Sequence, residues 1–166
     1  MKEFLKKNIE KFGFDKVGFS KLEKIDEEDA LKFISSIESK NYNVLPYLKK
    51  SIESRINPKL IFPEGKTIIS FATSYYRNLP ENFIFSKYLT KLDYHIVLKR
   101  RMEKLVNFLK DKIGNFNYKI FVDAGPLLEK YWAYKSGIGW LGKNSLLITK
   151  EFGSFVFLSE IIVDFE

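Results

Sequence analysis

The sequence of 166 residues contains no cysteine and only one histidine, His95. Without cysteine, these residues cannot form disulfides, zinc–thiolate sites or cysteine-ligated iron–sulfur clusters. The sequence also has no apolar leader at its N-terminus and no run of roughly 18–20 apolar residues, which a membrane span requires. We therefore expect a cytoplasmic protein with no membrane partner.

Apolar and aromatic residues are plentiful instead, at 45% and 16% of the sequence. Disordered chains are poor in aromatic residues, so this composition argues for a folded protein. A length of 166 residues lies within the usual range of one domain, roughly 100–200 residues. We expect residues 1–166 to form a single domain with its own core.

The charge is unbalanced, with 28 Lys and Arg residues against 21 Asp and Glu residues and a formal net charge of +7. A basic surface favours an anionic partner such as nucleic acid. The alternative is a compositional bias toward Lys, Ile and Phe with no functional meaning. Charge alone does not separate the two.

Helical and strand-like patterns alternate along the chain. Hydrophobic spacing and punctuation by Gly and Pro predict helices at 4–12, 30–37, 98–109 and 126–136, and strands at 16–20, 66–76, 118–122, 145–149 and 154–163. The last two strands are separated by a short Gly-containing turn and are expected to form a hairpin. The pattern predicts an α/β (α+β) fold with a single mixed sheet flanked by helices.

A glycine-rich segment, 137–144 (GIGWLGKN), contains both a GxGxxG and a GxxxxGK pattern. Both nucleotide-binding motifs must follow a strand and open a helix, so that phosphate meets the helix N-terminus. Here a predicted helix precedes the segment and a strand follows it, and Asn144 stands where a P-loop needs Ser or Thr. Two interpretations remain open: tight backbone packing, or a loop that contacts a ligand.

Several segments together resemble one known family. Residues 123–145 (DAGPLLEKYWAYKSGIGWLGKNS), followed by FGSF at 152–155 and LSEI at 158–161, are similar to the signature of epoxyqueuosine reductases. Further similar blocks lie at 12–19 (FGFDKVGF), 55–58 (RINP), 65–70 (GKTIIS), 86–88 (SKY) and 93–95 (DYH). The sequence departs from the family pattern at Leu89 and Lys91, where Ala and Gly are usual.

The resemblance implies a fold like that of cobalamin-processing and nitroreductase-like domains. Family members use cobalamin and two four-iron four-sulfur clusters to reduce epoxyqueuosine to queuosine in the tRNA anticodon loop. They continue into a cysteine-rich ferredoxin-like domain. We therefore expect residues 1–166 to be the cobalamin-binding catalytic domain, with the clusters in a missing C-terminal domain or an electron-donor partner. Without them the chain is expected to turn over poorly.

The resemblance assigns Asp123 as the proton donor to the substrate. Such a role needs a carboxyl that keeps its proton near neutral pH, which burial against an apolar ligand face would favour. The alternative is a helix N-cap, since Asp before Gly-Pro-Leu suits capping. His95 is not expected to bind cobalt, because the family holds cobalamin without a protein ligand to the metal.

The residues expected at the cofactor come from several segments of the sequence. They are Arg55, Ser86, Tyr88, Lys143, Asn144, Ser145, Leu147, Ser154 and Leu158. Lys143 and Asn144 can donate hydrogen bonds to the polar periphery of a corrin. Leu147, Leu158 and Tyr88 could equally belong to the core, and Arg55 to a surface salt bridge.

Two rival functions remain. The chain could be a non-catalytic cobalamin carrier, or a small basic RNA-binding module that uses no cofactor. Binding of cobalamin separates the second from the others.

Overall fold

The computed structural model of the chain describes residues 1–39, 46–78, 80, 84–89 and 92–166. Its helices are α1 (Lys2–Asn8), α2 (Glu27–Glu38), α3 (Pro46–Lys50), α4 (Ile52–Ile56), α5 (Tyr94–Ile113) and α6 (Glu129–Lys135), with 3-10 turns η1 (Ile9–Phe12) and η3 (Pro58–Leu60). Its strands are β1 (Lys16–Lys21), β2 (Thr67–Ser74), β3 (Tyr118–Phe121), β4 (Trp140–Leu141), β5 (Leu147–Ile148) and β6 (Val156–Val163). None of the helices within these residues is long and apolar enough to cross a bilayer.

Within the described residues, one sheet organises the fold, with strand order β1-β2-β6-β3 and antiparallel pairing throughout. β2 and β6 are central; β2 is buried as far as Thr73 and β6 from Ser159 onward, as their runs of β-branched and apolar residues predict. In the register, Glu160 of β6 lies between Ser70 of β2 and Phe121 of β3. A second, two-stranded sheet joins β4 to β5.

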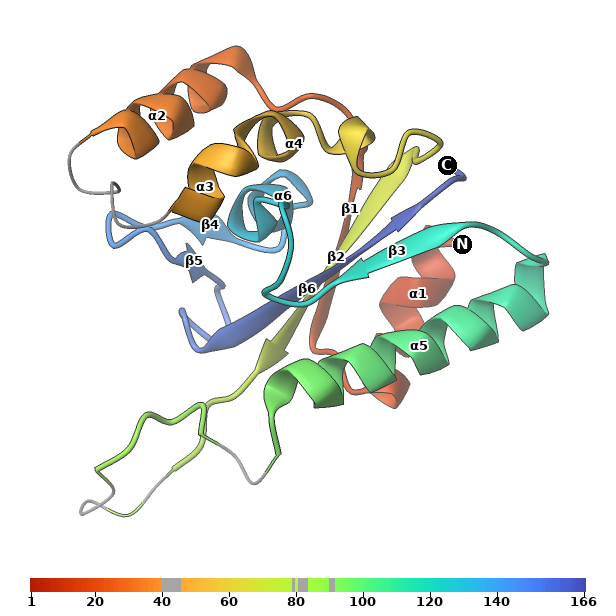
Figure 1. Cartoon of the computed structure of the whole chain (residues 1–166). Coiled ribbons are helices and arrows are strands. Elements are labelled where there is room, and N and C mark those ends of the chain that lie inside the picture. The colour runs from red at the N-terminus through yellow and green to blue at the C-terminus, as the bar shows by residue number, and fades with distance from the viewer. Residues whose placement is uncertain (40–45, 79, 81–83, 90–91) are drawn as a thin grey trace.

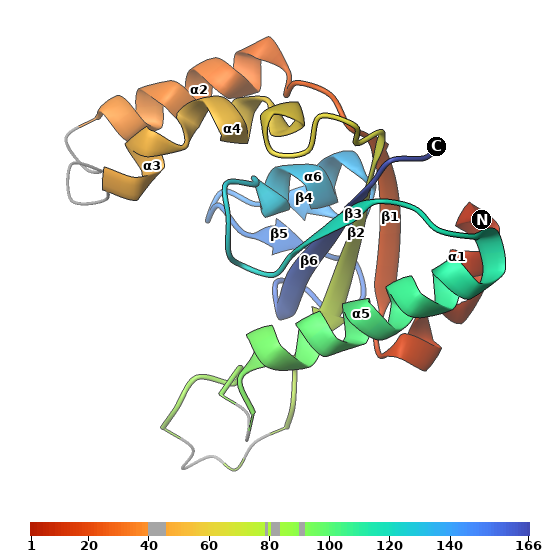
Figure 2. The ribbon, with the colours of Figure 1, turned by 45° about the vertical axis from the view of Figure 1, so that its right-hand side comes forward.

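Helices cover both faces of the main sheet (Figures 1 and 2). α1 and α5 pack on one face, and α6 packs on the other, beneath the layer formed by α2, α3 and α4. Successive side chains of a strand point to opposite faces. Ile161 and Val163 therefore join the core under α5, whereas Ile162 joins the core under α6.

The predicted α/β class, a sheet flanked by helices, is confirmed, although the sheet is antiparallel rather than mixed. The long helix after residue 93 is confirmed; it begins at an N-cap, Asp93, whose side chain accepts from the backbone N–H of His95 at 2.9 Å. Gly13, expected to stop the first helix, does so with φ +80°. Lys91, where the sequence departs from the family pattern, lies outside the described residues.

Two predictions about the last third are wrong. The helix expected from Pro126 begins only at Glu129, because the backbone of Leu128, with φ −86° and ψ 75°, is not helical. The expected hairpin of 145–149 with 154–163 does not form. Only Thr149 and Gly153 bridge, while β5 pairs with β4 and β6 enters the main sheet.

Candidate active site

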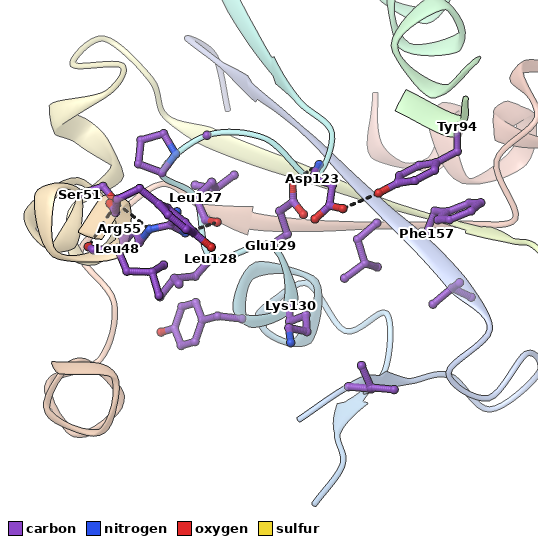
Figure 3. A pocket seen from close by; sticks show the side chains of 17 residues that line it. Leu48, Ser51, Arg55, Tyr94, Asp123, Leu127, Leu128, Glu129, Lys130 and Phe157 are labelled. Carbon is purple, nitrogen blue, oxygen red and sulfur yellow. Dashed lines mark hydrogen bonds between the residues drawn. The ribbon is translucent and has the colours of Figure 1, made fainter. Parts of the chain in front are cut away.

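A cavity of about 870 Å³ opens between α6, the start of α5, the edge of β6 and the helices α3 and α4 (Figure 3). Its walls are mainly apolar, with a small number of polar groups. The lining residues are Tyr47, Leu48, Ser51, Arg55, Tyr94, Asp123, Gly125, Pro126, Leu127, Leu128, Glu129, Lys130, Tyr131, Leu146, Val156, Phe157 and Leu158. Sites for small molecules commonly have this size and this mixture.

Asp123 lies just beyond the end of β3, where the chain turns toward α6 (Figure 3). Its φ of +49° is uncommon for a residue with a side chain, and such angles cost free energy unless the surroundings hold them. The side chain is 62% exposed and faces the cavity. Burial, which the sequence analysis expected at this carboxyl, is found instead at two glutamates behind it.

Two aromatic side chains from α5 hold the Asp123 carboxyl from one side. The Tyr94 hydroxyl donates a hydrogen bond to Asp123 Oδ2, and His95 Nε2 lies 3.9 Å from the same oxygen. The Tyr94 ring stacks on Phe157, with centroids 4.1 Å apart and an interplanar angle of 4°. Burial and the Asp123 carboxyl raise the pKa of Tyr94 well above its ordinary value, so this hydroxyl stays a donor at neutral pH.

Glu129, the first residue of α6, accepts a hydrogen bond from the Asp123 backbone on the other side. Its Oε1 accepts the Asp123 backbone N–H at 2.7 Å. Burial, followed by the nearby Asp123 carboxylate, raises the pKa of Glu129 to about 7, against the opposing effects of that hydrogen bond, Arg55 and Lys130. This carboxyl therefore changes charge close to neutral pH.

Glu160 lies deeper, on the face of β6 that is turned toward α6. It is 0% exposed, and within the described residues neither carboxyl oxygen has a hydrogen-bond partner. Burial, with smaller contributions from Glu129 and Asp123, raises its pKa well above the ordinary value. An isolated buried carboxylate is very costly, so Glu160 holds its proton at neutral pH.

Arg55 closes the opposite end of the cavity from α4. Its Nε donates to Ser51 Oγ at 2.9 Å and its Nη1 to the Leu127 carbonyl at 3.5 Å (Figure 3). Burial lowers its pKa, although an arginine stays charged at any relevant pH. These bonds tie α4 to the turn that follows Asp123, so the arginine fixes the cavity wall.

The structure brings three of the residues predicted from sequence into this cavity: Asp123, Arg55 and Leu158. The others lie outside its lining within the described part of the chain. Ser86 and Tyr88 belong to the 84–89 segment, where the Tyr88 ring meets the edge of Tyr75. Ser154 lies in the turn before β6.

The remaining predicted residues occupy the loop between β4 and β5. Asn144 and Lys143 are exposed there, and Ser145, with φ +61°, accepts a 2.8 Å hydrogen bond from Lys130 through its carbonyl. Leu147 is 3% exposed and packs in the core. Leu146, between them, lines the cavity, so this loop forms its rim.

The glycine-rich segment follows the end of α6. A Cβ at Gly139 would lie 2.2 Å from the Ile148 carbonyl oxygen, so β4 and β5 can pair only with glycine there. Gly137, at φ +77°, ends the helix in the left-handed conformation. Tight packing therefore explains Gly139, and the left-handed backbone angle explains Gly137.

Sequence reasoning missed Tyr94, Glu129 and Glu160 as members of the site. Each lies within a block that resembles the family, at 93–95, 123–145 and 158–161, but local spacing does not reveal that they converge. The contacts join α5, α6 and β6, which are far apart in sequence.

The chain is similar in sequence to known proteins. A family model described as "Epoxyqueuosine reductase QueG, DUF1730" matches residues 55–124. An epoxyqueuosine reductase of Cyclobacterium marinum is 35% identical over 98% of this chain and 54% of its own length. The chain thus spans about half the length of the curated relatives it matches.

Solved structures show the same fold. A crystal structure of an epoxyqueuosine reductase with an epoxyqueuosine-modified tRNA-Tyr stem loop has a TM-score of 0.80 at 31% identity, covering 98% of this chain and 45% of that chain. Another, from Bacillus subtilis, has its catalytic aspartate loop swung out of the active site, with a TM-score of 0.79 at 32% identity over 99% of this chain and 46% of that chain.

Proposed function

Because the chain belongs to the epoxyqueuosine reductase family, we propose that it forms the cobalamin-binding, proton-donating part of such an enzyme and acts in the cytoplasm on epoxyqueuosine in tRNA. One observation carries the proposal: an exposed aspartate, held by Tyr94 and Glu129, faces a large cavity with apolar walls. In the family, reduction also uses iron–sulfur clusters. This chain has no cysteine, so cysteine ligands for them would come from elsewhere.

The cavity suits a corrin. A corrin presents broad apolar faces and a rim of amides, and the lining supplies Phe157, Leu158 and Val156 on β6 and Leu146 on the facing loop. The exposed amide of Asn144 and the ammonium of Lys143 stand next to Leu146 on that loop, where they can donate to the rim. We propose that these residues, with Arg55, Ser145 and Leu158, hold the cofactor, while Ser86, Tyr88, Leu147 and Ser154 support the outer border.

The proposed role of Asp123 follows from its position. Removal of an epoxide oxygen as water consumes two electrons and two protons; the electrons would come from reduced cobalt of the bound cofactor. A carboxyl on the cavity wall can deliver one of the protons to the departing oxygen. The Tyr94 hydroxyl fixes the orientation of that carboxyl, and the stacking of Tyr94 on Phe157 fixes the tyrosine ring.

The basic charge of the chain supports a tRNA substrate. Lys and Arg residues can contact phosphates of a stem loop, and a relative has been solved with such a stem loop bound. Under this proposal the net charge of +7 has a function and is more than a compositional bias.

A cobalamin titration tests cofactor binding directly. Purified chain is expected to shift the cobalamin spectrum from the base-on to the base-off form with saturable behaviour. A folded sample that leaves the spectrum unchanged would favour the RNA-binding alternative instead.

Turnover separates the catalytic role from a carrier. In an enzyme completed with its iron–sulfur clusters, Asp123→Asn is expected to retain cobalamin affinity and lose about 10²–10⁴-fold in turnover of an epoxyqueuosine stem loop. Unchanged turnover would remove the acid role, and absence of turnover in the unmodified complete enzyme would favour the carrier.

A further inference from the structure

We propose that Glu129 is a positioning residue for the proposed acid: its carboxyl anchors the Asp123 backbone in the inward conformation, and the strength of that anchor depends on the charge of Glu129. The inference rests on the proposed function and names what holds its catalytic group in place.

The geometry of the turn creates the need for an anchor. Asp123 at φ +49° and Gly125 at φ +112° leave the chain between β3 and α6 without regular hydrogen bonding. A non-glycine residue in the left-handed region is strained, and a well-placed hydrogen bond can offset that strain. The bond from the Asp123 N–H to Glu129 Oε1, at 2.7 Å, is the contact that fixes this backbone.

In a relative, the corresponding loop adopts a second conformation. The Bacillus subtilis relative was solved with its catalytic loop swung out of the active site. Leaving the inward position in this chain requires breaking the bond to Glu129. The bond from Tyr94 holds only the tip of the Asp123 side chain, which can rotate without moving the backbone.

The charge of Glu129 sets the strength of the anchor, because a carboxylate accepts an N–H more strongly than a neutral carboxyl does. Groups from every neighbouring element act on it. Asp123 on the preceding turn, Tyr94 on α5 and Glu160 on β6 face Glu129, while Arg55 on α4 and Lys130 on α6 favour its ionised form. Because Glu160 is neutral, it does not oppose ionisation of Glu129 at neutral pH.

The balance of these effects places the titration near neutrality. Burial and the Asp123 carboxylate raise the pKa of Glu129 to about 7, so the anchor strengthens as pH rises from about 6 to 8. Protonation on the acid side weakens it and favours release of the turn.

Solution NMR on the ¹⁵N-labelled chain tests this without any cofactor. The Asp123 amide resonance is expected to shift with pH in a step centred near pH 7, and the step is expected to vanish in Glu129→Gln. A wild-type resonance with no such step, or a step that persists in Glu129→Gln, would overturn the proposal.

Amide hydrogen exchange supplies the second readout. Glu129→Gln keeps an acceptor oxygen and is expected to leave Asp123 exchange within about threefold of wild type, whereas Glu129→Leu removes the acceptor and speeds it about tenfold or more, as loss of one hydrogen bond predicts. If the Asp123 amide exchanges at the same rate in Glu129→Leu as in wild type, Glu129 does not anchor this backbone. If that variant does not fold, the pH step in wild type and Glu129→Gln decides.

A matched control is available at the start of α2. Glu27 is also the first residue of its helix but is exposed. Glu27→Gln should preserve both the pH step and the exchange rate of Asp123. Failure of cobalamin binding would refute the proposed function while leaving these measurements interpretable, so the two ideas fail separately.

Discussion

The two faces of the main sheet come from alternate residues of the same strands, yet they differ in chemistry. The face under α1 and α5 packs Ile69, Phe71, Ile161 and Val163, each at most 1% exposed, and its buried polar side chains are neutral hydroxyls. The face under α6 carries Glu160, the one carboxyl among the fully buried residues of the described chain. Both faces bury an apolar core, but only the α6 face also buries a carboxyl next to the cavity residues Asp123 and Glu129.

Truncation on the α5 face gives the largest expected change in stability. Leu105 is 0% exposed in the core between α5 and the sheet. Leu105→Ala should lower the free energy of unfolding by about 3 kcal/mol, because it removes buried methyl groups and leaves a cavity. Urea denaturation measures this. Cobalamin affinity of the folded fraction should not change; a weakened affinity would mean that the two faces are not independent.

Neutralising Glu160 on the α6 face is expected to raise the free energy of unfolding, whereas truncation of Leu105 lowers it. Its folded pKa lies well above the ordinary 4.5, so the folded protein binds more protons than the unfolded chain and stability falls as pH rises above that value. Glu160→Gln removes this penalty and should raise the free energy of unfolding at pH 8, with little change at pH 4.

Urea unfolding at the two pH values measures the difference, with the exposed Glu27→Gln as its control. Some pH dependence should remain, because the pKa of Glu129 is raised in the same direction. A Gln variant that is less stable at pH 8 than wild type would show that Glu160 is satisfied by an interaction which the fold does not reveal.

The smallest change in the free energy of unfolding is expected at Tyr94, where the two faces of the sheet meet. Tyr94 stands at the start of α5 and reaches around the sheet to Asp123. Tyr94→Phe loses one hydrogen bond at an exposed carboxyl but keeps the stacking on Phe157. The free energy of unfolding should change by less than about 1 kcal/mol in urea titrations at pH 7. A loss of more than about 2 kcal/mol would place this bond among the structural ones.

Patterns that act over a few residues were sufficient to predict much of the fold. The apolar stripe through Leu98, Met102 and Leu105, with Gly114 beyond it, identified α5, and the β-branched run identified β2. The predicted order around the glycine-rich segment, with a helix before it and a strand after it, is also found. In these cases the local preference and the tertiary structure agree.

The errors arose where contacts between residues far apart in sequence determine the local structure. Residues 145–149 and 154–163 look like hairpin partners, but β6 pairs instead with β2 on one edge and β3 on the other, which places it at the centre of the main sheet. Pro126 looks like a helix start, but the non-helical backbone of Leu128 delays the helix to Glu129. The acids behind Asp123 were not predicted, because the burial of Glu160 depends on which face of β6 it takes and that of Glu129 on how α6 packs against the sheet.

That alternation has a consequence for how the chain folds. A slip of β6 by one residue against β2 would exchange its two sets of side chains. Glu160 would then enter the apolar layer beneath α5, and Ile161 would turn toward the cavity. A carboxyl group is far more costly in such a layer than a misplaced isoleucine. Glu160, which destabilises the native state, therefore also destabilises the state with the shifted register.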